Sequence, residues 1–170
     1  MVVSKDIHML MWERLSKEFV MSASLWLRVR VLIGVLAVSL STQLAAATRV
    51  ETLAVSEGYV RHLGNLINDY RAGHGLQPLI PAENLAALAD EHSAGMAAQR
   101  KLSHDGFRDR AQRTQSAVCV ENVGWNYPSP ETQLEGWRKS PTHDRNLLHP
   151  KVSRMGLAVN TRYVAFFACT

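Results

Sequence analysis

The chain has 170 residues, 46% of them hydrophobic and 20% charged, a composition that excludes a disordered or fibrous protein and is typical of a globular one. Its formal net charge of +4 falls to about +2 from Thr48 onward, where 14 Lys and Arg residues oppose 12 Asp and Glu residues. So small a positive balance does not indicate nucleic-acid binding.

Residues 1–47 are predicted to be an N-terminal extension with a secretory signal peptide. Two arginines precede a short apolar run at 31–40, and three alanines that end at Ala47 form an A-x-A cleavage signal. The run is too short to cross a bilayer comfortably, so we expect cleavage after Ala47, with an uncleaved N-terminal anchor as the alternative. A signal peptide that starts at Met21 would have an ordinary length, which suggests a natural start downstream of Met1.

Residues 48–56 are predicted to be a lead-in, and 57–170 a single domain. From Glu57 the chain favours an amphipathic helix that ends at Gly73-His-Gly75, where a glycine supplies a left-handed cap. Its apolar residues recur every three or four positions, at Tyr59, Val60, Leu63, Leu66, Ile67 and Tyr70.

A second helix is predicted between Pro81 and Arg100-Lys101, with Glu83 in its acidic first turn. His92 lies on the apolar stripe of this helix. Because buried polar groups are normally satisfied, we interpret His92 as a hydrogen-bonded core residue rather than a ligand.

After the second predicted helix, His104 and Glu121 stand at positions that the hydrophobic pattern does not explain. Asp105-Gly106 is a turn signal, so His104 is expected on a loop. A polar, exposed short helix follows over 108–116, and 117–124 reads as a strand with Glu121 in its middle. An unpaired buried carboxylate is costly, so Glu121 must either point to water or have a partner.

The C-terminal third predicts two helices and two strands. Ser129-Pro130-Glu131 begins one helix, and Ser140 with Pro141 begins another, ended by Pro150. We expect the Ser140 hydroxyl to accept a hydrogen bond from the backbone N–H of His143. The two strands are expected at 156–160 and 163–169.

Two cysteines, Cys119 and Cys169, lie in the exported part of the chain. In an oxidising compartment this pair predicts a disulfide that closes a loop of about fifty residues, with two free buried thiols as the alternative.

Several short motifs occur in the order seen in bacterial members of the CAP (SCP) superfamily, which the chain resembles over residues 57–169. This superfamily includes cysteine-rich secretory proteins, insect-venom antigens and plant pathogenesis-related proteins. The motifs are Asn68-Asp-Tyr-Arg71, Pro78-Leu79, Ser103-His104, Glu121-Asn122-Val123 and Trp137-x-x-Ser-Pro-x-His-x-x-Asn-Leu-Leu148.

The resemblance implies an α+β fold, a three-layer α-β-α sandwich with a small antiparallel sheet and a groove across one side. Two histidines and two glutamates line the family's groove and can hold a divalent metal. His104 matches the first histidine and Glu121 one glutamate, while Ser140 stands where the eukaryotic branch has its second glutamate. His143 matches the histidine of the bacterial Ser-Pro-x-His motif and is assigned to the place of the second histidine.

His104, Glu121 and His143 would form a two-histidine, one-carboxylate set, which suits a weakly held zinc. Their sequence spacing does not require a metal, and the alternative is a metal-free cluster in which Glu121 hydrogen-bonds a histidine.

Three classes of function are compatible with the sequence. The first is a secreted or periplasmic binding module for a lipid, peptide or cell-envelope ligand, with Trp125, Tyr127 and Trp137 framing the groove and no transmembrane span in the mature chain. The alternative for these aromatic residues, and for Trp137 on its helix stripe in particular, is that they belong to the core. The second is a hydrolase in which Glu121 activates water or Ser140 is a nucleophile. The third is a structural or interaction domain.

Overall fold

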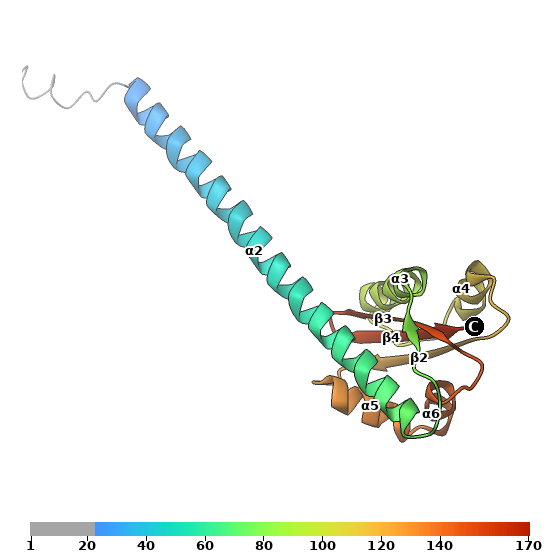
Figure 1. The fold of residues 1–170 in the computed structure, drawn as a ribbon. Coiled ribbons are helices and arrows are strands. Elements are labelled where there is room, and N and C mark those ends of the chain that lie inside the picture. The colour runs from blue at the N-terminus through green and yellow to red at the C-terminus, as the bar shows by residue number, and fades with distance from the viewer. Residues whose placement is uncertain (1–22) are drawn as a thin grey trace, which may run out of the picture. The chain divides into compact units, whose positions relative to one another are not determined.

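The chain divides into two units, Met1–Val50 and Glu51–Thr170, and the computed structural model describes residues 23–170 (Figure 1). Met21 and the first part of the predicted signal peptide lie outside these residues. From Ala23 the backbone is helical, as part of α2 (Ala23–Ala72). No helix in the described part of the chain is both long and apolar enough to cross a membrane.

The helix predicted from Glu57 begins earlier than expected, because α2 continues through residues 48–56. The segment contains neither glycine nor proline, so nothing in it ends a helix. The predicted end of this helix is confirmed, since α2 stops at Ala72 and Gly75 adopts a φ of 72°.

The remaining elements follow the predicted order. Their bounds are β1 (Ile80–Pro81), α3 (Glu83–Gln99), α4 (Phe107–Thr114), β2 (Cys119–Trp125), α5 (Pro130–Arg138), α6 (Pro141–Leu147), β3 (Arg154–Asn160) and β4 (Tyr163–Cys169).

The four strands form one sheet in the order β1-β3-β4-β2. β4 pairs antiparallel with both β2 and β3, whereas the two-residue β1, which the sequence did not predict, pairs parallel with β3. β2 is therefore an outer strand.

Helices cover both faces of the sheet (Figure 1). Alternate residues of β4 pack into two hydrophobic clusters, Val164 and Phe166 in one and Ala165 and Phe167 in the other. The first cluster contains side chains of α2, α5 and α6, and the second contains side chains of α3 and α4. This arrangement is the predicted α-β-α sandwich.

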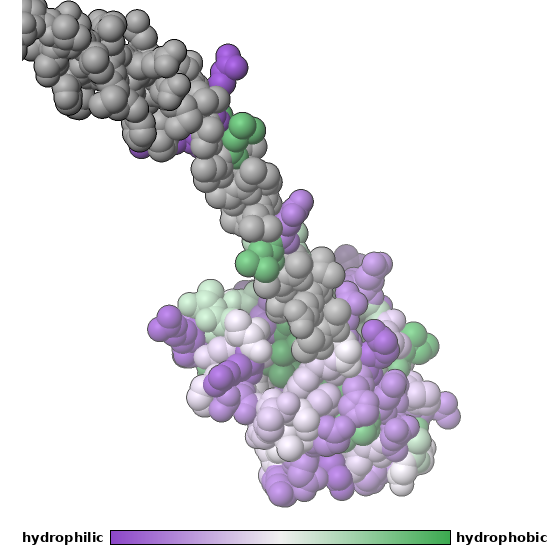
Figure 2. Space-filling view, turned by 90° about the vertical axis from the view of Figure 1, so that its left-hand side faces the viewer, coloured by the Kyte–Doolittle hydropathy of each residue, from purple (hydrophilic) through white to green (hydrophobic). Residues whose placement is uncertain are grey.

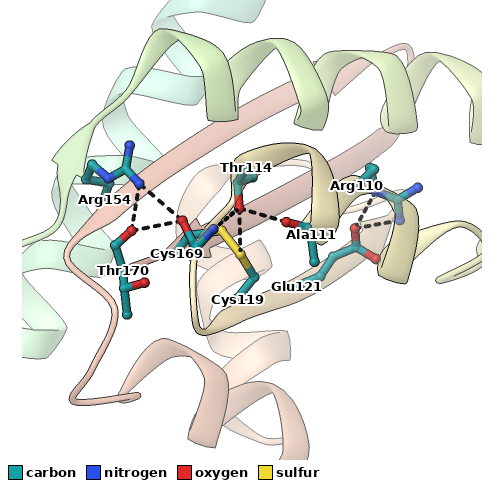
Figure 3. Close-up of a disulfide and its surroundings, with 9 residues drawn as sticks. Arg110, Ala111, Thr114, Cys119, Glu121, Arg154, Cys169 and Thr170 are labelled. Carbon is teal, nitrogen blue, oxygen red and sulfur yellow. Dashed lines mark hydrogen bonds and ion pairs between the residues drawn. A yellow bond between two sulfur atoms is a disulfide. The ribbon is translucent and has the colours of Figure 1, made fainter.

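The predicted disulfide is present. Cys119 of β2 and Cys169 of β4 are paired in the sheet register, and their sulfur atoms are bonded (Figure 3). The free-thiol alternative is therefore wrong. Thr114 Oγ1 of α4 lies 3.4 Å from the sulfur of Cys119, which joins this helix to the end of β2.

Candidate functional site

Glu121 lies at the centre of a polar cluster beside the outer strand β2. Side chains alternate along a strand, so Glu121 faces the α3 and α4 side of the sheet while its neighbour Asn122 faces α6. The Glu121 side chain is only 3% exposed. The sequence required a partner for a buried carboxylate here, and the structure supplies one.

That partner is Arg110, in the middle of α4. Its Nε and Nη2 donate to Glu121 Oε2 at 3.0 and 2.6 Å (Figure 3). Its Nη1 donates to the backbone carbonyl of Asp105 at 2.8 Å, and the side chain is 8% exposed. The guanidinium is therefore held on both sides.

The helix predicted over 108–116 was expected to be exposed, and Arg110 was not among the predicted site residues. A signal was present, because the half-buried or buried residues Phe107, Arg110, Ala111 and Thr114 follow the i, i+3, i+4, i+7 spacing of a core-facing stripe. A buried arginine on such a stripe requires partners for its charged N–H groups, and a buried acid is one such partner.

His104 lies on the predicted loop, between α3 and α4. Its Nδ1 is 2.9 Å from Glu121 Oε1, and the side chain is 51% exposed. A carboxylate can only accept, so Nδ1 carries the proton and donates to Glu121. The remaining nitrogen, Nε2, is the one available to another molecule.

His92 is the hydrogen-bonded core histidine that the sequence predicted. It is 8% exposed, and its Nε2 is 2.8 Å from the carbonyl oxygen of Ser103 and 3.7 Å from Glu121 Oε1. Burial lowers the pKa of His92, an effect that the positive charge of Arg110 reinforces and the negative charge of Glu121 opposes. His92 is thus neutral at pH 7.

His143 approaches the same cluster from α6, on the other side of β2. Its ring centroid is 6.3 Å from that of His104. Partial burial lowers the pKa of His143, and the neighbouring His104 lowers it further. The structure therefore places the ring of His143 near that of His104, which in turn contacts Glu121.

Ser140 is the N-cap of α6 by position, but its hydroxyl does not accept the predicted hydrogen bond from the backbone. The Ser140 carbonyl instead accepts from the N–H of Asp144 at 2.8 Å, which is the first ordinary helical bond. The position of His143 is fixed by other contacts. Asn122 Nδ2 donates to the His143 carbonyl at 3.0 Å, and Asn146 Nδ2 donates to the carbonyl of Glu121 at 2.9 Å.

The aromatic frame predicted for the groove is only partly exposed. Trp137 is 1% exposed and its Nε1 donates to the Val123 carbonyl at 2.9 Å, so Trp137 is a core residue and does not line a groove. Trp125 and Tyr127 are exposed. Tyr127 packs over Gly136 of α5, where a Cβ atom would overlap its ring.

A divalent metal does not fit the predicted ligands in this arrangement. Both oxygens of Glu121 are already engaged, one by Arg110 and the other by His104. A cation at Oε2 would lie beside the guanidinium, and like charges repel strongly where burial reduces screening. In the described part of the chain, no three His, Cys, Asp or Glu side chains are arranged to hold a metal.

The same contacts limit hydrolytic chemistry. Because the Glu121 carboxylate is buried and occupied, it has no free oxygen directed at a substrate water. Among the described residues no hydrogen bond joins the hydroxyl of Ser140 to His143, so a nucleophile and base pair is not formed. What the cluster does offer is one half-exposed imidazole, held in place by a buried acid.

A separate recess of about 730 Å³ lies beside the edge of β3. α2, α3 and β3 line it, and His104, Glu121, Ser140, His143, Trp125 and Trp137 do not. Its apolar lining includes Val60, Ala82, Ala86, Met155 and Leu157, and its polar lining includes Glu57, Arg61, Asn65 and Glu83.

Comparisons with known proteins agree with this architecture. The cysteine-rich secretory protein family, CAP, matches residues 65–169. The uncharacterized membrane protein YlbC of Bacillus subtilis (strain 168) is 28% identical over 106 residues, which are 58% of this chain and 31% of that protein. The chain thus spans about a third of the length of this relative.

Solved structures resemble about two thirds of the chain. An extracellular protein with an SCP domain from Bacillus anthracis is 25% identical, with a TM-score of 0.64, over 68% of this chain and 41% of that chain. A cysteine-rich secretory protein from Staphylococcus aureus is 22% identical, with a TM-score of 0.62, over 67% of this chain and 38% of that chain. An outer surface protein of Borrelia burgdorferi is 16% identical, with a TM-score of 0.60, over 65% of this chain and 90% of that chain. The last two show likeness of fold alone.

Proposed function

The chain belongs to the cysteine-rich secretory protein family, CAP, and on this premise we propose that its second unit is an extracytoplasmic binding module for a lipid or another ligand with an apolar body. The similar structure from Bacillus anthracis, at 25% identity, is of an extracellular protein, which supports export. The disulfide between Cys119 and Cys169 supports the same compartment, because such bonds persist in oxidising surroundings.

The observation that carries this proposal is the recess between α2, α3 and β3. Its volume of about 730 Å³ lies within the range of small-molecule sites, which are mostly apolar with a few polar groups. Val60, Met155 and Leu157 would contact the apolar body of a ligand. Arg61 and Asn65 would interact with its polar end.

The test fills the recess without changing the core. Ala86 lines the recess, and Ala94 is an exposed residue of the same helix that does not. We expect Ala86→Phe to weaken binding of a fluorescent long-chain fatty acid at least tenfold and Ala94→Phe to leave it unchanged. Fluorescence titration measures both affinities. Equal affinity in the two variants, or no binding by the unmodified protein, would refute the proposal.

A second candidate is recognition of a polar peptide or cell-envelope ligand by His104 and His143. It is favoured by the half-exposed His104, whose free Nε2 lies on the side of the ring away from Glu121. His104→Ala would then abolish protection of the protein against heat by cell-envelope fractions, while Ala86→Phe would not.

A further inference from the structure

The polar cluster around Glu121 combines imidazole and carboxylate groups with a cation that belongs to the protein, and in the described part of the chain no three such groups are arranged to hold a metal. Two imidazoles lie beside one oxygen of the carboxylate: His104 Nδ1 donates to Oε1 at 2.9 Å, and His92 Nε2, which is bonded to the Ser103 carbonyl, lies 3.7 Å from Oε1. The guanidinium of Arg110 takes the other oxygen through two N–H groups. Imidazole and carboxylate together are the donors that suit zinc.

Arg110 is fixed where it stands. Its Nη1 is bound to the carbonyl of Asp105, and Gly106 leaves room for it, because a Cβ atom there would lie 3.1 Å from Nη1. The side chain is only 8% exposed and pairs with Glu121 of β2 rather than extending into solvent. It therefore cannot move away to admit another cation without breaking three hydrogen bonds.

We infer that Arg110 is the built-in counter-ion of this cluster and the residue that excludes divalent metal from it. The guanidinium supplies the positive charge that a carboxylate buried among imidazoles requires. Replacing Arg110 by a neutral side chain leaves Glu121, His92 and His104 without that charge, and the cluster then takes Zn²⁺ or Co²⁺.

The experiment compares zinc and cobalt binding by the full chain and its variants, using protein purified without a metal-affinity column. Calorimetry gives the affinity, cobalt absorption reports coordination, and thermal melting reports stabilisation by the metal. The unmodified protein should show neither binding nor a change in melting temperature at millimolar metal. Arg110→Met should gain at least about tenfold in zinc affinity and be stabilised by zinc.

Three controls isolate the role of the charge. Arg113→Met removes an exposed arginine of the same helix and should gain nothing. Arg110→Lys keeps a cation and should also gain nothing. Arg110→Met with Glu121→Gln lacks the carboxylate and should lose the gained affinity.

Two results would overturn the inference. One is zinc binding by the unmodified protein that is lost in Glu121→Gln. The other is a folded Arg110→Met protein that binds zinc no better than the unmodified one. Should Arg110→Met not fold, Arg110→Gln replaces it, since its neutral amide still donates to Glu121, and the same two results decide.

Discussion

At the residue scale, the main feature is the buried ion pair of Glu121 and Arg110. Glu121 and Arg110 are both buried, and each is the other's compensation. Taking two ions out of water is costly, so such a pair adds little stability over apolar residues, but losing one member leaves an uncompensated buried charge. The identity of this pair is therefore constrained even if the cluster contacts no ligand.

We predict that Glu121→Ala lowers the free energy of unfolding by about 3–5 kcal/mol, because it leaves Arg110 buried without its acid. Urea denaturation measures the change. Glu135→Ala is the matched control, since Glu135 forms exposed ion pairs with Arg138 and Lys139, which contribute little. A similar small loss in both variants would show that the Arg110 pair is not essential to the fold.

Stability should also depend on His92 as the pH falls. The pKa of His92 is lowered in the folded protein. As the pH falls below about 6.5, the ordinary pKa of histidine, the unfolded chain therefore binds a proton at His92 before the folded protein does. The neutral His92 therefore contributes stability above this pH, and the contribution is lost as the pH decreases. Denaturation at pH 7 and pH 5 should show a smaller loss for His92→Gln than for the unmodified protein. Equal losses would contradict the prediction.

Some of these residues could be predicted from the sequence and others could not, for physical reasons. The sequence indicated that Glu121 must either point to water or have a partner and that His92 belongs to the core, because burial of polar groups has local consequences along a strand or helix. It could not find Arg110 as the partner, since that contact depends on how α4 packs on the sheet. It also assigned the hydroxyl of Ser140 a bond that the backbone geometry does not make.

At the element scale, close contact between α3 and β3 depends on a single glycine. A Cβ atom on Gly156 would overlap the backbone of Leu85, so the helix and the strand approach each other without an intervening side chain. This contact places the first turn of α3 beside the recess, which Ala82, Glu83 and Ala86 line. Backbone atoms cannot yield as a flexible side chain can.

We predict that Gly156→Ala destabilises the protein by about 1–3 kcal/mol, the usual effect of overpacking a core. Gly95→Ala is the control within α3, where a Cβ atom meets nothing within 4 Å. There alanine should raise the melting temperature, since it favours the helix by up to about 1 kcal/mol over glycine. Thermal melting of both variants decides, and an equal rise in the two would disprove the close contact.

The outer strand β2 shows how the helices prepare one edge of the sheet. Trp137 of α5 donates to the Val123 carbonyl, and Asn146, near the end of α6, donates to the Glu121 carbonyl. These carbonyls would otherwise be open to pairing with another strand. The same bonds hold α6, and thus His143, beside the cluster.

Element types were largely predictable, and their limits less so. Hydrophobic periodicity predicted α3, α5 and the hairpin of β3 and β4 because each has a strong local pattern and clear end signals. The two-residue β1 has no pattern of its own, since both of its residues are exposed and only pairing with β3 defines it.

At the scale of the whole second unit, the sandwich could be predicted from the order of its elements and from family resemblance. The recess could not, because it depends on the spacing of α2, α3 and β3, which come from distant parts of the sequence. The view in Figure 2 shows a mainly hydrophilic surface with scattered hydrophobic areas on this unit. The hydropathy of the surface in this view therefore does not by itself indicate a binding face.

The disulfide ties the two ends of this unit's second half, across a sequence separation of 50 residues. In the chain-entropy account a loop of this length contributes about 4 kcal/mol, by restricting the unfolded chain. Reduction should thus lower the melting temperature by about 10–20 °C while leaving the folded sheet intact at low temperature, because β2 and β4 are paired along their whole length. Melting with and without reductant measures this shift. The variant with both Cys119→Ala and Cys169→Ala should melt at the reduced value and ignore the reductant, and a melting temperature equal to that of the oxidised protein would show that sheet pairing alone supplies the stability.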